Sequence, residues 1–180
     1  MGFVKQWGED QTMDLIDQYA GESERAFART GDRLAWKGRS YRHYRMQRWW
    51  RAFLAGGIAA TCLRQRTLAA SARAAAERYA RALERDRNEL PRAMASALRG
   101  ALAHRLGDAG TAERTLRDAV AGFGRLRLGA YTLGAERALG LVVGGDEGRT
   151  LIERCDAKLR AEGVARPDRL VEAFVPGFAD

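Results

Sequence analysis

Five arginines spaced three residues apart are the side chains whose type and pattern best suit a binding function. Aromatic residues lie among them, and basic side chains interleaved with aromatic rings are the combination that binds single-stranded nucleic acid. The arginines are Arg39, Arg42, Arg45, Arg48 and Arg51, and the aromatic residues are Tyr41, Tyr44, Trp49 and Trp50. These five arginines are the candidate partner-binding residues of the chain.

Helical geometry weakens the case for nucleic acid. A step of three residues turns a helix by about 300°, so five such arginines spread over about 240° and form no single stripe along a phosphate backbone. Apolar positions in the same segment recur at three and four residues, which assigns its aromatic residues to packing between helices. Three interpretations stay open for the basic side chains: an acidic protein partner or an acidic face of this chain, nucleic acid, or a solvated helix surface.

Charge is distributed unevenly along the first third of the chain. Residues 1–24 carry one base and six acids, net −5, whereas residues 25–51 carry nine bases and one acid, net +8. The excess in that second segment equals the formal charge of all 180 residues. Such asymmetry indicates an acidic partner or partial neutralisation by the preceding acidic segment.

No arrangement of residues predicts catalysis. Residues 141–150, LVVGGDEGRT, lack the glycine spacing of a phosphate-binding loop and have Arg149 in place of its lysine. We expect them to form a turn between two helices, with Asp146 as the N-cap of the second helix. His43 and His104 are far apart in the sequence and belong to no metal-ligand pattern. The serines lie in no nucleophile-elbow motif. We therefore expect no enzyme activity, no cofactor and no metal.

The cysteines and the hydropathy pattern indicate a cytoplasmic protein. Cys62 and Cys155 belong to no CxxC motif, so we expect two reduced thiols. The N-terminus has no secretory leader pattern. The longest uncharged run, residues 52–63, has 12 residues, whereas a helix needs about 20 to span a bilayer.

Composition and periodicity predict an all-α fold. The chain is rich in Ala, Arg, Leu and Glu, which are strong helix formers, and has only three Pro. Its apolar residues recur at three and four residues throughout, as in the stripe formed by Leu98, Leu102 and Leu106. Helix breakers separate these periodic segments about forty residues apart, at Gly21, residues 64–67, Gly107 and the pair Gly144–Gly145.

This spacing predicts four antiparallel helix pairs and a short last helix. The first helices of the pairs are expected at 9–20, 41–63, 91–106 and 130–143, the second helices at 22–38, 67–87, 109–126 and 147–162, and the last helix at 167–174. A helix pair repeated about every forty residues is typical of an α-solenoid, and a plain helical bundle is the alternative. We treat residues 1–180 as a single helical repeat domain.

One repeat can be followed residue by residue. Gly100 provides a small residue where two helices cross, Gly107 turns the chain with Asp108 capping the next helix, and Ala112, Leu116 and Ala119 form a small-large-small face. This register resembles a tetratricopeptide repeat. Gly57 and Gly140 are the further candidate repeat-packing glycines, although Asp156 stands where the copy beginning at Gly140 needs a bulky apolar residue.

The chain also resembles the C-terminal tetratricopeptide-like region of large bacterial signalling proteins. These are serine/threonine protein kinases and related AAA-type ATPase regulators of myxobacterial type. The resemblance lies in the segments GALAHRLGD (100–108), RALGLVVGGDEGRTLIERCDAKLRAEGV (137–164) and ARPDRLVEAFVPGF (165–178). It implies the C-terminal part of a larger signalling architecture. It does not imply kinase or ATPase activity, because this chain has none of the corresponding catalytic motifs.

These observations favour a non-enzymatic scaffold for protein–protein interaction. We expect it to bind a protein or peptide segment in the groove lined by the first helix of each pair. A basic helical nucleic-acid-binding protein is the alternative. The sequence does not specify the partner or the oligomeric state.

Overall fold

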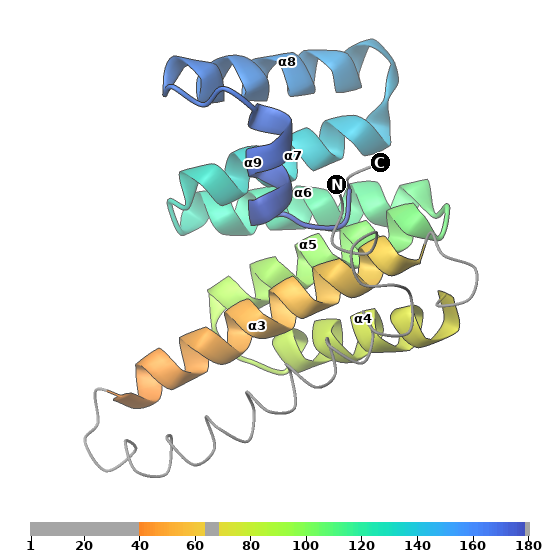
Figure 1. Ribbon diagram of the computed structural model, residues 1–180, viewed down its shortest axis with the longest axis vertical. Helices are drawn as coiled ribbons and strands as arrows, with labels where there is room; N and C mark the ends of the chain where they lie inside the picture. Colours follow the sequence, from red (N-terminus) through yellow and green to blue (C-terminus); the bar gives the residue numbers. More distant parts are fainter. Residues whose placement is uncertain (1–39, 64–68, 179–180) are drawn as a thin grey trace.

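The structure, a computed structural model, describes residues 40–63 and 69–178 (Figure 1). It contains α3 (Ser40–Cys62), α4 (Ala69–Glu84), α5 (Glu89–Arg105), α6 (Ala109–Arg125), α7 (Gly129–Val143), α8 (Gly145–Ala161) and α9 (Pro167–Phe174). Every regular element in these residues is a helix, which confirms the prediction of an all-α fold. The helices expected at 9–20 and 22–38 lie outside the described residues.

The boundaries of α4 and α5 differ from the sequence prediction by one to three residues. Helix α4 stops at Glu84 because the next residues form a turn, in which the carboxylate of Asp86 accepts the backbone N–H of Asn88 at 3.0 Å. Helix α5 begins at Glu89, two residues before the expected Pro91. Proline is tolerated there because N–H groups in the first turn have no partner within the helix.

Gly107 makes the tight joint between α5 and α6. Its φ of +79° lies in the left-handed region, and its N–H donates to the carbonyl oxygen of His104. The next N–H, from Asp108, donates to the carbonyl oxygen of Ala103, which completes a Schellman motif. The Asp108 carboxylate then accepts the N–H of Thr111 at 3.0 Å and caps α6, as the sequence predicts.

The joint between α6 and α7 repeats this geometry with a different residue. The N–H of Arg127 donates to Gly124 and that of Leu128 donates to Phe123. Arg127 has a φ of +55° where a glycine is usual. The joint was placed correctly at residues 127–129, but the left-handed arginine was not expected.

The joint between α7 and α8 corrects a sequence interpretation. Asp146 was expected to cap α8 in the way that Asp108 caps α6. Instead Gly144 occupies the N-cap position, and Asp146 lies in the first helical turn, paired with Arg149. Gly144 and Gly145 have φ values of +65° and +58°, so the chain reverses within two residues and places the aspartate inside the helix.

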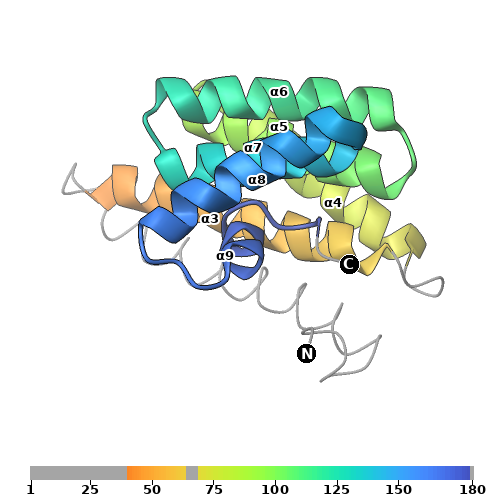
Figure 2. The same cartoon turned by 90° about the horizontal axis from the view of Figure 1, so that it is seen from above.

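Successive helices from α3 to α8 run in alternating directions, and each packs against the next (Figure 1). Helix α3 also contacts α5, while α9 contacts α7 and α8. Seen from above, α9 lies on the same side of the array as α3, and α6 lies on the other side (Figure 2). Helices α3 and α5, the first helices of two pairs, contact one another, and the ring of Trp50 in α3 lies 4.9 Å from that of Tyr131 in α7, the first helix of the next pair.

Alanine dominates the core of this array. Helix α5 lies in contact with α3, α4 and α6 and buries most of its residues, many of them alanines. Small side chains allow close approach of helix axes, and a few large ones fill the space between them. The largest of these fully buried side chains are Phe53, Phe123, Leu83, Met94, Leu98 and Leu116.

Candidate functional site

The five candidate arginines do not form one described surface. Arg39 lies outside the described residues, and the structure does not describe the side chain of Arg42. Arg48 is exposed, Arg51 is half-buried, and Arg45 pairs with an acidic residue of the same chain. The acidic segment 1–24 also lies outside the described residues, so its expected neutralising role stays a prediction.

Arg45 ties α3 to the joint between α4 and α5. Its guanidinium donates to both oxygens of Asp86, at 2.8 and 2.7 Å, and the Nε1 of Trp49 donates to the same carboxylate at 2.9 Å. Burial would raise the pKa of Asp86, but hydrogen bonds from Arg45, Asn88 and Trp49 together hold it well below its usual range. Arg45 and Trp49 are thus engaged in a structural contact.

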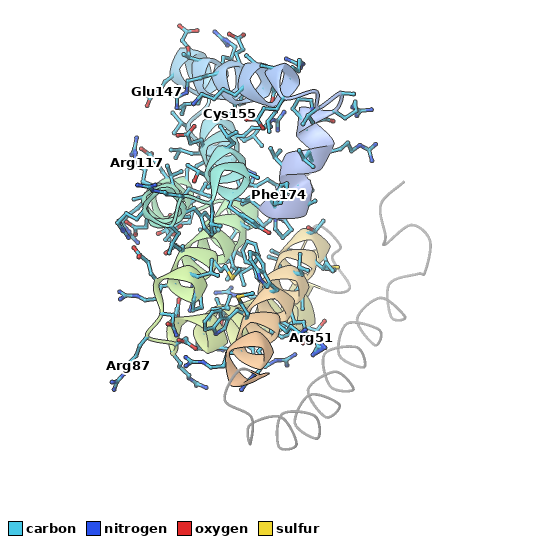
Figure 3. All side chains as sticks on the ribbon, turned by 90° about the vertical axis from the view of Figure 1, so that its left-hand side faces the viewer. Arg51, Arg87, Arg117, Glu147, Cys155 and Phe174 are labelled. Atoms are coloured by element: carbon cyan, nitrogen blue, oxygen red, sulfur yellow. The ribbon has the colours of Figure 1, made fainter. Side chains whose placement is uncertain are left out.

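Trp50 belongs to an aromatic cluster that joins three elements. Its ring lies 4.9 Å from that of Tyr131 in α7 and 6.4 Å from that of Phe53. Tyr131 in turn meets Phe174 of α9 edge to face at 4.8 Å. Figure 3 shows Phe174 on α9, with Arg87 and Arg117 at the outside of the array. Trp50 therefore packs between helices, as the apolar spacing of its segment predicts.

The repeat-packing residues of the third pair meet at one crossing. A Cβ on Gly100 would lie 2.7 Å from Cγ of Leu116 and 3.3 Å from Oγ1 of Thr115. Ala112, Leu116 and Ala119 are fully buried on α6. Gly100 thus allows the Leu116 side chain to reach the backbone of α5.

Gly140 lies at a different kind of crossing. A Cβ there would lie 2.8 Å from the carbonyl oxygen of Gly148 and 2.9 Å from Cγ1 of Ile152. Conversely, a Cβ on Gly148 would overlap the carbonyl oxygen of Gly140. The two helices touch backbone to backbone near their joint, and Asp156 lies further along α8.

Gly57 packs against the end of the described chain and not against a helix of its own pair. A Cβ on Gly57 would overlap the ring of Pro176, which belongs to the non-helical residues 175–178 that follow α9. We call these four residues the strap. A Cβ on Gly134 of α7 would lie 2.9 Å from Cγ2 of Val175, so a second glycine receives the strap.

The rest of the strap lies on α5. A Cβ on Gly177 would lie 2.8 Å from Cβ of Ala101, and the ring of Phe178 stacks on that of His104 at 5.5 Å. Arg105 donates through Nε to the carbonyl oxygen of Gly177 at 2.9 Å. We call the surface that receives the strap the strap face, which comprises Gly57 and Ala60 of α3, Ala101, His104 and Arg105 of α5, and Gly134 of α7.

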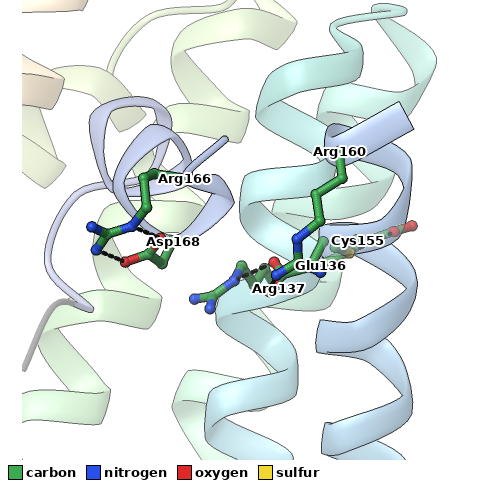
Figure 4. Close-up of polar contacts among 7 residues, drawn as sticks. Glu136, Arg137, Cys155, Arg160, Arg166 and Asp168 are labelled. Atoms are coloured by element: carbon green, nitrogen blue, oxygen red, sulfur yellow. Dashed lines mark hydrogen bonds and ion pairs between the residues drawn. The ribbon is translucent and has the colours of Figure 1, made fainter. Parts of the chain in front are cut away.

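A group of charged side chains joins α7 to α8 (Figure 4). Arg137 donates through Nε to Asp156 at 2.9 Å, with exposed fractions of 16% and 13% for the two side chains. Arg154 pairs with Glu136 at 3.3 Å, and Arg160 approaches Asp156 at 3.7 Å. At Asp156, where a tetratricopeptide-like register would have a bulky apolar residue, α7 and α8 are therefore joined by an ion pair.

Both cysteines are free thiols and both are buried, as expected. Burial raises the pKa of the Cys62 thiol. Burial, with the neighbouring Glu136, raises the pKa of Cys155 to about 12. Since the thiolate is the reactive form, both side chains behave as packing residues at neutral pH.

Within residues 40–63 and 69–178, no three His, Cys, Asp or Glu side chains come together as a metal site requires. Over the same ranges, no helix combines the length and the apolar character needed to cross a membrane. His104 contacts the strap, and the side chain of His43 is not described. Sequence reasoning missed the strap face, because its residues come from three helices and its glycines have no common spacing.

Comparisons with protein-family models, with curated proteins and with solved structures gave no match. The candidate site therefore has to be interpreted from its own geometry.

Proposed function

We propose that this protein is a non-enzymatic scaffold of tetratricopeptide-like type, built as an α-solenoid, which binds an extended segment of a partner protein on the strap face. The observation that carries the proposal is the strap itself. Four residues without helical structure lie across α3, α5 and α7, held by apolar contacts and by one hydrogen bond from Arg105 to the backbone. A face that accepts one extended segment has the shape to accept another.

The serial packing of the helices supports a solenoid-type scaffold. Each helix from α3 to α8 contacts the next along the chain, and Schellman joints close the connections after α5 and α6. Repeats that contact mainly their neighbours present long continuous faces, which proteins of this architecture use for binding. The first helices of the pairs supply the strap face, as a peptide-binding groove of this type requires.

The same geometry weighs against the nucleic-acid alternative. Arg45 is committed to Asp86, and Trp49 donates to the same carboxylate, so neither is available to a phosphate or a base without breaking this contact. The resemblance to the C-terminal region of bacterial signalling kinases would make the scaffold a cytoplasmic interaction region. That assignment stays a proposal.

Peptide selection from a random library on the immobilised full chain tests the function. We expect selected peptides to bind saturably, with a dissociation constant that changes little between 50 and 300 mM salt. Hydrogen exchange should show protection in α3, α5 and α7 when the peptide is bound. Protection confined to α4, α6 and α8 would contradict the proposed binding face.

A labelled single-stranded oligonucleotide serves as the competing ligand in the same assay. Fluorescence anisotropy at 150 mM salt should give only weak binding, in the range of about 1–100 μM or above that is usual for nonspecific contacts. A submicromolar constant that is lost when Arg42, Arg45 and Arg48 become Ala would favour the nucleic-acid-binding alternative.

A further inference from the structure

We propose that residues 175–178 are an intramolecular ligand of the strap face, and that a partner segment carrying the same pattern, an apolar residue followed by Pro, Gly and an aromatic residue, competes with them for it. This inference rests on the proposed function and names both the chemistry of the partner and the element that controls access to it.

The pattern of the strap matches the shape of the face residue by residue. Pro176 lies over Gly57, where any side chain on α3 would overlap its ring. Val175 lies in the same way against Gly134 of α7. Two helices thus present bare backbone at the two positions where the strap carries branched or cyclic side chains, which is a steric selection for this order of residues.

The third and fourth positions are selected by backbone conformation and by a ring. Gly177 has a φ of +111°, a conformation that favours glycine, and its close approach to Ala101 leaves no room for a Cβ. Phe178 is 6% exposed and stacks on His104. A competing segment therefore needs glycine at the third position and an aromatic ring at the fourth.

Two side chains form hydrogen bonds with the backbone of the strap. Arg105 of α5 donates to the carbonyl oxygen of Gly177, while the N–H of Gly177 donates to Oε1 of Glu172 at 2.8 Å. The first contact comes from the face and is available to any segment that takes the place of the strap. The second comes from Glu172 of α9, which is not part of the strap face.

The strap is suited to exchange with a partner because few side chains hold it. Val175 and Phe178 are its large buried side chains, whereas all four residues must give up backbone freedom to be seated. In the free energy of seating the strap, the gain from burying these two side chains is therefore partly cancelled by the loss of backbone entropy. A ligand can bind the face only in molecules whose strap is released. Its apparent dissociation constant is therefore the intrinsic constant divided by the fraction of molecules in which the strap is released.

Two substitutions distinguish effects on the strap from effects on the strap face. Gly177→Ala acts on the strap, because it strains the backbone and meets Ala101, and it leaves the face unchanged. Gly57→Ala acts on the face, because its methyl group occupies the place of the Pro176 ring. Alanine is a better helix former than glycine, so Gly57→Ala should not weaken α3 itself.

The binding probe is a fluorescein-labelled peptide with the sequence of residues 172–178, EAFVPGF, and the control peptide carries Ser in place of Pro176 and Phe178. We expect the full-length Gly177→Ala variant to bind the probe at least about tenfold more tightly than the wild type does. The double variant Gly57→Ala, Gly177→Ala should lose this gain, and the control peptide should not bind. Equal binding to wild type and Gly177→Ala, or undiminished binding to the double variant, would overturn the proposal.

Hydrogen exchange on the wild-type chain gives a second measurement that needs no variant. Excess probe peptide should speed exchange at the amide of Gly177, and the control peptide should leave it unchanged. An unchanged rate at saturating probe would also overturn the proposal. Should library-selected peptides bind wild type and Gly177→Ala equally on the strap face, the strap inference fails and the proposed function stands. Should the probe behave as expected while selected peptides bind elsewhere, the strap inference stands and the proposed function fails.

Discussion

The crossing of α5 with α6 and the crossing of α7 with α8 use glycine in two different ways. At the first, Gly100 faces the side chain of Leu116, which is fully buried. At the second, Gly140 faces Gly148, and the two backbones touch. A small residue at a helix crossing can therefore complement either a large side chain or another small residue, and the two solutions respond differently to added volume.

The two crossings also differ in what surrounds the glycine. Helix α6 buries Ala112, Leu116, Ala119 and Phe123 against its neighbours, and its ion pair with α5, between Arg125 and Glu89, lies at an exposed position. Helix α8 instead places Asp156 opposite Arg137 of α7. The glycine contact between α7 and α8 lies near their joint, and the ion pair lies further along the crossing.

The largest effect is expected from Gly148→Ala. Its methyl group would overlap the carbonyl oxygen of Gly140, and a backbone atom cannot move aside by changing rotamer. We expect the free energy of unfolding to fall by about 3 kcal/mol, measured by urea denaturation. Gly110→Ala is the matched control, because its nearest contact is an ordinary one with Asp108 at 3.9 Å. Similar stability of the two variants would mean that α7 and α8 do not touch at this point.

Breaking the ion pair between α7 and α8 should have the next largest effect. Asp156→Ala leaves the guanidinium of Arg137, which is mostly shielded from solvent, without its carboxylate partner. Because the pair is not fully buried, we expect a loss of about 2–3 kcal/mol in unfolding free energy.

The double variant Arg137→Met, Asp156→Leu distinguishes a need for charge from a need for volume at this crossing. We expect it to recover most of the stability that Asp156→Ala loses, because replacing both partners removes the stranded charge. A double variant as unstable as Asp156→Ala would mean that this position requires the ion pair itself.

Gly100→Leu tests the apolar crossing. The added side chain overpacks the space held by Leu116, which we expect to cost about 1–3 kcal/mol, although leucine favours the helix by nearly 1 kcal/mol. Combining it with Leu116→Ala should restore part of the loss, because here the obstacle is a side chain that can be removed. A melting midpoint equal to or above that of the wild type would show that Gly100 is not required at this crossing.

The smallest change in unfolding free energy is expected from Gly124→Ala, which should stabilise the protein where the preceding variants destabilise it. Gly124 lies in α6 with no atom within 4 Å of an added Cβ. Alanine should therefore raise the unfolding free energy by about 0.5–1 kcal/mol through helix propensity alone. Thermal denaturation followed by circular dichroism measures it, and a destabilised variant would show that helix glycines of this array are constrained beyond their crossings.

Much of the local structure was predictable from local signals. The period of the apolar residues places the described helices within a few residues, and Gly107–Asp108 gives a joint with the expected left-handed glycine and capping aspartate. The same reasoning was wrong for Asp146, because a second left-handed glycine at Gly145 moves the start of α8. It also gave no sign that Arg127 adopts a positive φ, since that position is fixed by the two hydrogen bonds of the joint.

The candidate site was less predictable, because its residues are brought together over long separations. The arginine pattern identified Arg45, but not its partner Asp86, which lies 41 residues away. Gly57 was identified as a packing residue, whereas its contact with Pro176 depends on where α9 directs the chain.

The sequence by itself determined that the described chain is helical and where it turns, because helix periodicity, capping and left-handed glycines act within a few residues of one another. Only the tertiary structure decided which glycine meets a side chain, which meets a backbone and which receives the strap. Those contacts depend on the distance and register between helices, which are set by how all the side chains at a crossing fill space together.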